Sequence, residues 1–245
     1  MKYFFVLALG RSGTAFLADL LSRDPGAQVN HEPSPLDPKI LSLRYSGGFD
    51  RVVEQMLDQR FQEVLPENAT HRIYGETNSY LRYEAEWLRR RFSATLIHLV
   101  RDGRDFIRSA YTRSVYTPWE EHQPIVPKDD DPFAAIWGDM TRFERLCWYW
   151  QHTNRVLADQ IERPVRLETV LADFGYFEER ILAPTGLSVE QSVWRHAIAN
   201  PRNTSKQNSR SQKLRDLVLR RQRQTFAPLP HWSRWDPAMS DRFWE

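Results

Sequence analysis

VLALGRSGTAFL, residues 6–17, is an apolar segment with the pattern of a strand that leads through a short glycine-bearing turn into a helix. α/β proteins build phosphate-binding sites in this way, because free N–H groups and the positive dipole end at the helix start attract anions. Gly10 and Gly13 allow the backbone to approach a ligand closely, and Arg11 adds a guanidinium that is always charged. The turn therefore predicts a binding site for a phosphate or sulfate group.

The turn differs from the ATP-binding loop of ordinary P-loop proteins. That loop has the form G-x-x-x-x-G-K-[ST], and its lysine contacts the phosphates. No lysine occurs between Lys2 and Lys39. The missing lysine argues against a P-loop kinase, which remains an alternative function.

A second motif, ATLIHLVRDGRDFIRSAY, occupies residues 94–111. An apolar strand ends in Arg101, a D-G turn follows, and the next helix carries Ser109 eight positions after the arginine. A strand-end arginine offers a bidentate fork to a phosphate, and a helix hydroxyl supplies a second donor. The structural alternative is that Arg101 pairs with Asp102 or Asp105 and that Ser109 lies on a solvated helix face.

The two motifs, in this order, resemble those of the sulfotransferases that use 3′-phosphoadenosine 5′-phosphosulfate (PAPS). The first loop of that family reads roughly x-x-[RK]-S-G-T-[ST]-x-L, and this chain has GRSGTAFL at residues 10–17. The resemblance implies transfer of a sulfuryl group from PAPS to an acceptor hydroxyl of a carbohydrate or other natural product. It implies a P-loop-like α/β fold in which Arg101 and Ser109 bind the 3′-phosphate of the donor. The residues that it implies for the 5′-phosphosulfate are Arg11, Ser12, Gly13, Thr14 and Ala15.

Two acidic turns offer a base that could take the proton of an acceptor hydroxyl. The first, NHEP at residues 30–33, resembles the glutamate-bearing segment of bacterial carbohydrate sulfotransferases and of the tyrosylprotein enzymes. The second, GETNSY at residues 75–80, resembles the family's [KE]-[ST]-P-[ST]-Y stretch. We predict Glu32 as the base, with His31 as the next candidate and Glu76 behind it.

Each candidate base also has a purely structural interpretation. Glu32 could cap the turn before a proline, His31 could be a satisfied imidazole, and Glu76 could pair with Arg72 or Arg82. Arg11 is predicted to act in catalysis as well as in binding, because negative charge grows on the leaving phosphate in the transition state.

A third donor-binding element of the family is a basic loop near the C-terminus. Its counterpart here is NTSKQNSR, residues 203–210, and the resemblance assigns Lys206 and Arg210 to the donor. It lacks the family's R-K-G-x-x-G form, which favours the bacterial or carbohydrate-type branch. The surrounding residues 202–223 carry eight basic side chains against Asp216 alone, which fits a solvated helix face, a donor-phosphate site or a dock for an acidic acceptor.

Length and composition indicate one α/β domain over residues 1–245, with no linker that divides the chain. The single cysteine, Cys147, excludes a disulfide framework and is typical of a reducing compartment, so we expect a cytoplasmic protein. The apolar N-terminus is too short to span a membrane, and we expect neither a transmembrane segment nor a nucleic-acid partner. We expect no metal ion, since no carboxylate motif resembles a magnesium site.

Apolar strands alternate with helical patterns, which predicts a mostly parallel sheet covered on both faces, with ligands at the carboxyl ends of the strands. The segment at residues 116–135 is polar and rich in proline, and we expect it to be a long loop or lid. A module that binds the nucleotide without catalysis is a further alternative to the enzyme. The expected strands are 3–9, 27–31, 72–76 and 94–100, and the expected helices are 13–23, 48–64, 81–91, 104–115 and 137–160. A further strand followed by a helix is expected in PVRLETVLADF, residues 164–174.

Overall fold

A central parallel sheet organises the part of the chain that the structure describes. This structure is a computed structural model and describes residues 1–65, 71–113, 115–117 and 125–200. The five strands lie in the order β2-β3-β1-β4-β5, and every neighbouring pair is parallel. Their bounds are β1 Lys2–Ala8, β2 Ala27–His31, β3 Ile73–Asn78, β4 Thr95–Val100 and β5 Val165–Arg166.

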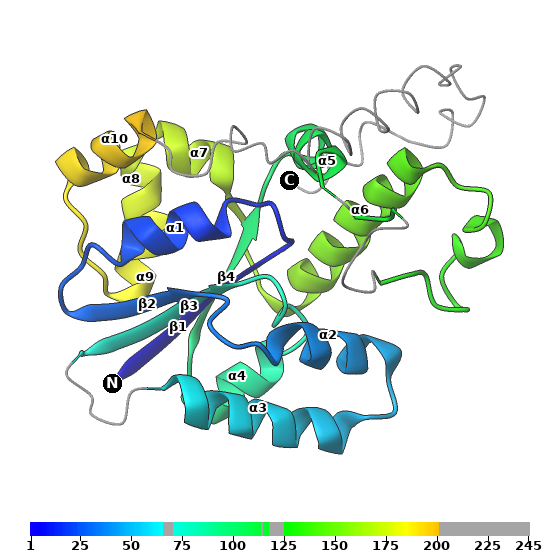
Figure 1. Cartoon of the computed structure of the whole chain (residues 1–245). Helices are drawn as coiled ribbons and strands as arrows, with labels where there is room; N and C mark the ends of the chain where they lie inside the picture. The colour runs from blue at the N-terminus through cyan, green and yellow to red at the C-terminus, as the bar shows by residue number, and fades with distance from the viewer. Residues whose placement is uncertain (66–70, 114, 118–124, 201–245) are drawn as a thin grey trace, which may run out of the picture. The chain divides into compact units, whose positions relative to one another are not determined.

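Helices cover both faces of the sheet (Figure 1). Side chains alternate along β1, so Phe4 and Val6 face one hydrophobic core and Phe5 and Leu7 face the other. The first core includes the helical elements α1 Thr14–Leu21, α7 Leu167–Ala172, α8 Phe174–Phe177, η2 Glu178–Leu182, α9 Ala183–Thr185 and α10 Gln191–Ala199. The second includes the helices α2 Asp37–Ser46, α3 Asp50–Val64, α4 Ala85–Phe92 and α6 Arg142–Gln160.

Two further elements complete the described fold. Helix α5, Gly103–Tyr111, packs against α6, and a single turn of 3-10 helix, η1, spans Ala134–Ile136. The prediction of an α/β fold with a mostly parallel sheet is confirmed, because all the described strands are parallel and both faces are covered. The described residues all belong to one compact unit. Residues 201–245 lie outside the described residues, so a single domain over the whole chain stays a prediction.

The proline-rich segment after β2, EPSPLDP at residues 32–38, has the composition of a turn, but its end is helical. Helix α2 begins at Asp37, with Pro38 in its first turn, where the missing N–H costs no helical hydrogen bond. Gly47 ends the helix with φ 75°, a conformation that favours glycine. The helix predicted to start at residue 48 is α3, which begins at Asp50.

The start of α6 also differs from the prediction. This helix begins at Arg142 rather than at residue 137, because Thr141 and Glu144 form a capping box there. Of the predicted loop or lid at residues 116–135, the described part contains only η1 as a regular element. A lid function for it stays a prediction.

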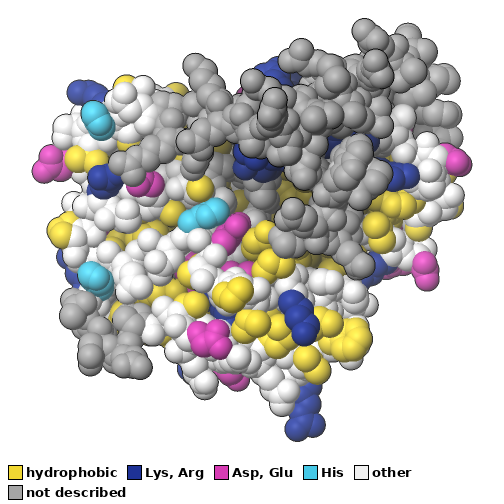
Figure 2. Space-filling view, viewed as in Figure 1, with side chains coloured by type: hydrophobic (Ala, Val, Ile, Leu, Met, Phe, Trp, Pro, Cys, Tyr) yellow, Lys and Arg dark blue, Asp and Glu magenta, His cyan; other side chains and the backbone are white. Residues whose placement is uncertain are grey.

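The described surface also has an apolar region. Figure 2 shows hydrophobic side chains gathered over the connection between α2 and α3, where Phe49 and Val52 are 46% and 44% exposed. Among the described residues, no helix is both long enough and apolar enough to cross a membrane.

Candidate functional site

The loop between β1 and α1 has the backbone geometry of an anion site. Arg11 and Gly13 both have positive φ, 74° and 81°, and Ser12 N–H donates to the Leu9 carbonyl at 3.2 Å. No side chain caps the start of α1, so its first N–H groups remain available to a ligand. Positive φ at a non-glycine residue is costly and is often found at functional sites. The loop therefore fits the predicted role in binding phosphate or sulfate.

The two sequence motifs meet directly at the carboxyl ends of β1 and β4. Arg11 Nε donates to Ser109 Oγ at 3.2 Å, and Arg101 Nη1 donates to the Arg11 carbonyl at 2.9 Å. Residues almost a hundred positions apart in the sequence thus form one cluster, as the parallel sheet predicts for neighbouring strand ends.

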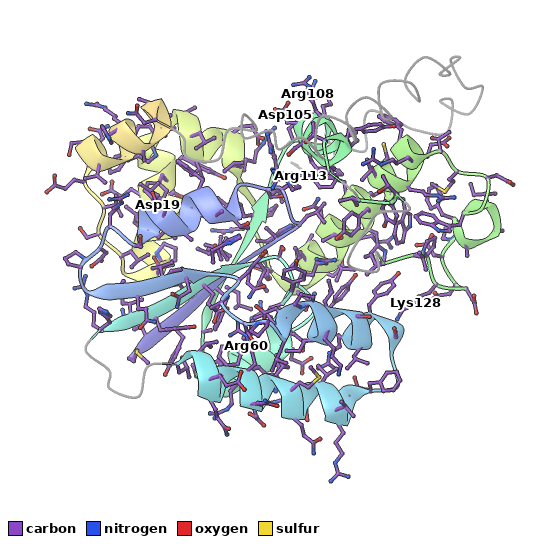
Figure 3. The ribbon with its side chains drawn as sticks, in the orientation of Figure 1. Asp19, Arg60, Asp105, Arg108, Arg113 and Lys128 are labelled. Atoms are coloured by element: carbon purple, nitrogen blue, oxygen red, sulfur yellow. The ribbon has the colours of Figure 1, made fainter. Side chains whose placement is uncertain are left out.

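The arginines of this cluster have no carboxylate partner within ion-pair distance among the described residues. The structural alternative for Arg101 is wrong, because Asp102 binds Arg104 at 2.7 Å and Asp105 binds Arg108 at 2.8 Å. Figure 3 shows Asp105 and Arg108 side by side on α5.

The pKa of Arg11 also indicates that this residue lies within a cluster of positive charges. Burial, together with the nearby charges of Arg113 and Arg101, lowers the pKa of Arg11. A bound anion would remove this repulsion between the arginines. The cluster is therefore complementary to a phosphate or sulfate group.

Glu32 lies next to this cluster, directly after β2. Its Oε1 accepts a hydrogen bond from Ser79 N–H at 3.2 Å and a second one from Ser79 Oγ. Its backbone φ is 45°, an unusual value for a residue before proline, and its side chain is 21% exposed. A carboxylate that is held in place and still reaches solvent has the properties of a general base.

His31 is oriented by the first loop rather than by Glu32 alone. Its Nε2 lies 3.0 Å from Thr14 Oγ1 and 3.8 Å from Glu32 Oε1. Thr77 Oγ1 in turn donates to the Thr14 carbonyl at 2.9 Å, which ties β3 to the start of α1. The loop is therefore hydrogen-bonded to the histidine, and the Glu32 carboxylate lies 3.8 Å from the same ring. We name Arg11, Glu32, Ser79, Arg101 and Ser109 the strand-end site.

Glu76 has entirely different surroundings from Glu32. It is fully buried, and its Oε1 accepts from Arg60 Nη1 at 2.6 Å and from the Tyr74 hydroxyl at 2.7 Å. Arg60 Nε also donates to Asp37 Oδ1 at 2.8 Å. Figure 3 shows Arg60 on α3, the helix that covers this face of the sheet. We name Asp37, Arg60, Tyr74, Glu76 and Asn78 the buried cluster.

The partners predicted for Glu76 were wrong. Arg72 pairs with Asp24 at 2.9 Å, while Arg82 donates to the Ser79 carbonyl and to the Tyr149 hydroxyl. Because Glu76 has no exposed surface, an acceptor hydroxyl does not reach it in this structure. The geometry gives Glu76 a structural role and leaves Glu32 and His31 as candidates for the base.

Asn78 connects the buried cluster to the strand-end site. Its Nδ2 donates to Asp37 at 2.8 Å and to Glu76 at 3.2 Å. Its Oδ1 accepts from the N–H groups of Tyr80 and Leu81 at 2.9 and 3.2 Å, which fixes the turn that carries Ser79. Neither Asn78 nor Ser79 was predicted as a site residue, although both lie in the quoted GETNSY segment.

Other predicted features of the site have no structural test. Lys206 and Arg210 lie outside the described residues. Within the described ranges, no group of three or more His, Cys, Asp or Glu side chains has the arrangement of a metal site.

Comparison with known proteins gives structural likenesses only. No protein-family model matches the chain, and no curated protein does. A sulfotransferase from Alicyclobacillus acidocaldarius is 15% identical with a TM-score of 0.48, over 89% of this chain and 90% of that one. The sulfotransferase domain from the curacin biosynthetic pathway is 14% identical with a TM-score of 0.44, over 94% and 93% of the two chains.

A third similar structure is mouse sulfotransferase SULT7A1 complexed with PAP, 16% identical with a TM-score of 0.44, over 99% of this chain and 81% of that one. At such identities and scores the likeness concerns the fold, and the functional argument rests on the residues of this chain. The chain is similar in fold to sulfotransferases of known structure.

Proposed function

We propose that this protein is a sulfotransferase that moves a sulfuryl group from PAPS to an acceptor hydroxyl. The observation that carries the proposal is the positive cluster of Arg11 and Arg101, which has no carboxylate partner among the described residues and lies beside a fixed carboxylate, Glu32. A phosphosulfate donor needs such a cluster, and an attacking hydroxyl needs such a carboxylate.

In this proposal each of the two motifs binds a different part of the donor. The loop from Arg11 to Ala15 holds the 5′-phosphosulfate through backbone N–H groups, the Arg11 guanidinium and the hydroxyls of Ser12 and Thr14. Arg101 and Ser109 hold the 3′-phosphate. Both parts of the donor therefore lie where β1 and β4 end.

The proposed reaction is an in-line transfer with Glu32 as base. Glu32 takes the proton of the acceptor hydroxyl while the oxygen attacks the sulfur atom. The bond from sulfur to the bridging oxygen breaks, and adenosine 3′,5′-bisphosphate (PAP) leaves with the electron pair. Arg11 stabilises the negative charge that grows on the bridging oxygen, so the scheme needs no metal ion.

A binding experiment with two nucleotides tests this proposal. PAP at about 100 times its Kd should raise the free energy of unfolding by about 2.7 kcal/mol, and ATP with magnesium should bind much more weakly. Transfer is then measured with radiolabelled PAPS and a panel of carbohydrate and other hydroxyl acceptors.

Two outcomes would reject the proposal. Turnover of ATP with magnesium, together with weak PAP binding, would identify a kinase. Tight binding of PAP without transfer to any acceptor on the panel would identify a non-catalytic nucleotide-binding module.

A further inference from the structure

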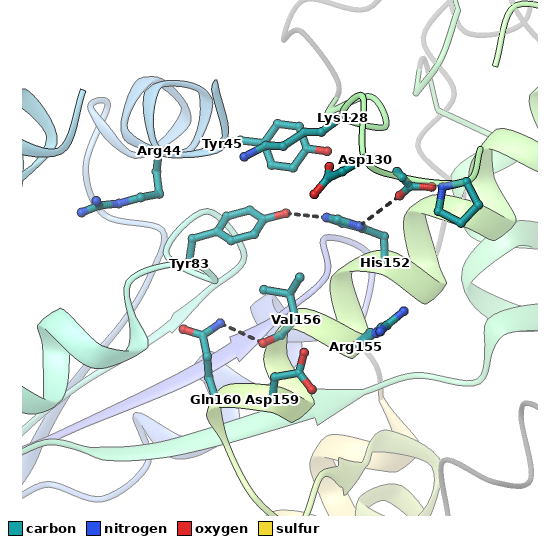
Figure 4. A pocket seen from close by; sticks show the side chains of 12 residues that line it. Arg44, Tyr45, Tyr83, Lys128, Asp130, His152, Arg155, Val156, Asp159 and Gln160 are labelled. Atoms are coloured by element: carbon teal, nitrogen blue, oxygen red, sulfur yellow. Dashed lines mark hydrogen bonds and ion pairs between the residues drawn. The ribbon is translucent and has the colours of Figure 1, made fainter. Parts of the chain in front are cut away.

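A pocket of about 610 Å³ lies between α2, the turn after β3, residues 128–132 and α6 (Figure 4). Its volume falls within the range of about 300–1,000 Å³ that is usual for small-molecule sites. None of its lining residues belongs to the strand-end site or to the buried cluster. The proposed donor chemistry therefore leaves this pocket without a role.

Aromatic side chains form part of the pocket wall. The His152 ring stacks on Trp148 with centroids 4.8 Å apart, and the Tyr45 ring meets it edge-on at 5.8 Å. The Nε2 atom of His152 lies 3.2 Å from the Tyr83 hydroxyl, a contact marked in Figure 4. Burial raises the pKa of Tyr83 to about 12 and lowers that of His152, so both rings are neutral at pH 7.

Two of the charged lining residues are already engaged by the protein. Arg44 pairs with Glu84 and Asp50, and Asp131 accepts from Trp148 Nε1 at 2.9 Å. The charge of Arg44 is neutralised by these carboxylates, and the Asp131 carboxylate is held in place by its hydrogen bond.

Four other charged lining residues have no ion-pair partner among the described residues. Lys128 and Asp130 lie on one side of the pocket, and Arg155 and Asp159 lie on α6 across from them (Figure 4). The two positive and two negative charges of these four side chains cancel one another. An anionic or a cationic ligand would be attracted by two of these side chains and repelled by the other two, so neither gains a net attraction from them.

A neutral ligand with many hydroxyl groups avoids both conflicts. Each hydroxyl can donate to a carboxylate and accept from a lysine or arginine, and such charge-assisted hydrogen bonds are stronger than neutral ones. The Tyr83 hydroxyl and the neutral His152 ring can join the same network. This combination of groups favours a polyhydroxylated ligand over a nucleotide or a polyamine.

Arg82 links the pocket to Glu32. Its guanidinium donates to the Ser79 carbonyl at 2.5 Å and to the Tyr149 hydroxyl at 2.9 Å, and Ser79 binds Glu32. Tyr83 is the next residue in the chain, and His152 follows Tyr149 by about one turn of α6. Arg82 and Tyr149 thus lie between Ser79 of the strand-end site and the pocket residues Tyr83 and His152.

We infer that this pocket binds an uncharged, sugar-like part of the acceptor, while the reacting hydroxyl of the same acceptor lies at Glu32. The inference rests on the proposed sulfotransferase function for the position of the reacting hydroxyl. Binding of a sugar in the pocket does not depend on that function, and this makes the two statements separable.

The test measures the binding of neutral disaccharides, lactose and cellobiose, to the full chain by ligand-observed NMR, with and without PAP. Asp159→Asn keeps size and removes the charge, Arg155→Gln replaces the charged side chain by a shorter neutral polar one, and both side chains are exposed on α6. Each substitution should raise Kd for a bound disaccharide by about 3–10-fold, the effect of one lost hydrogen bond. Matched controls are Asp58→Asn and Arg91→Gln, an exposed ion pair between α3 and α4 away from the pocket, which should leave Kd unchanged.

The outcomes test the pocket inference and the proposed sulfotransferase function separately. No disaccharide binding while PAP binds overturns the pocket inference and leaves the proposed function intact. Equal effects of pocket and control substitutions, or tighter binding of glucose 6-phosphate or spermine than of the neutral sugars, also overturn it. Disaccharide binding that is sensitive to Asp159 and Arg155, in a protein that does not bind PAP, supports the pocket and rejects the sulfotransferase.

Discussion

The strand-end site and the buried cluster each contain arginine and glutamate, but the arginine of the buried cluster forms ion pairs and those of the strand-end site do not. In the buried cluster, Arg60 binds Asp37 and Glu76, and all three side chains are fully buried. In the strand-end site, Arg11 and Arg101 have no carboxylate partner among the described residues, and Glu32 is bound by a serine. An arginine paired with carboxylates links elements of the fold, whereas an arginine without such a partner is available to a ligand.

The pKa values follow the same division. Burial alone lowers the pKa of Arg60, but the hydrogen bonds and charges of Glu76 and Asp37 outweigh it and raise that pKa. Burial and the charges of Arg113 and Arg101 lower the pKa of Arg11, and the nearby charge of Glu32 only partly opposes them. The two regions can therefore be separated by experiments that measure stability and function independently.

The largest expected effect is on stability. Arg60→Leu leaves two buried carboxylates without their cation, so the free energy of unfolding should fall by about 3–5 kcal/mol, measured by urea unfolding. The control Arg91→Leu removes an exposed arginine and should change it by less than about 0.5 kcal/mol. A loss below about 1 kcal/mol for Arg60→Leu would mean that the buried cluster does not hold the fold together.

Glu32→Gln should change catalysis and leave stability almost unaltered. The glutamine oxygen still accepts from Ser79 but cannot take a proton, so transfer should fall by about 10²–10⁴-fold at unchanged PAP affinity. Glu76→Gln should reduce transfer less and lower the unfolding free energy, because an amide replaces a carboxylate beside Arg60. Full activity of Glu32→Gln with an inactive but folded Glu76→Gln would reverse the choice of base.

Arg101→Ala tests whether an arginine without a carboxylate partner binds the donor. PAP affinity should fall by about 1.5–3 kcal/mol, the usual value of a charge-assisted hydrogen bond, and adenosine 5′-monophosphate affinity should change little. Isothermal titration calorimetry measures both, with Arg108→Ala as the control, since Arg108 is exposed and pairs with Asp105. Equal losses for the two nucleotides would make Arg101 a structural residue.

Ser79→Ala should have the smallest effect, because only one of its two hydrogen bonds to Glu32 is lost and the backbone N–H remains. A loss of about 1 kcal/mol corresponds to roughly a fivefold lower kcat, with PAP affinity unchanged and partial recovery in Ser79→Thr. A change in PAP affinity of the same size as the change in kcat would show that Ser79 acts on the donor instead of on Glu32.

Local patterns predicted the parts of the site that lie within short segments. The strand-turn-helix of residues 6–17 predicted the anion loop, and the second motif predicted that Arg101 and Ser109 lie at a strand end and on the helix after it. Cys147 is 7% exposed, and burial raises its pKa to about 12. The start of α2 was missed, because a segment with three prolines reads as a turn although Pro38 fits a first helical turn.

The partners of charged residues were the least predictable feature. Arg60 lies on the amphipathic helix α3, where an arginine is expected to face solvent, and only the packing of α3 on the sheet brings it to Glu76 and Asp37. The same packing buries Glu76, whereas Glu32 in the other acidic turn keeps a partly exposed carboxylate.

The sequence by itself thus determined the strands, the anion loop and the charges available at the strand ends, because these depend on residues close together in the chain. Only the tertiary structure decided which arginine is neutralised and which is left open, and that Asn78 joins the buried cluster to Ser79 and Glu32. The physical reason is that burial and ion pairing depend on which faces of distant helices and strands come into contact, and no local pattern specifies this.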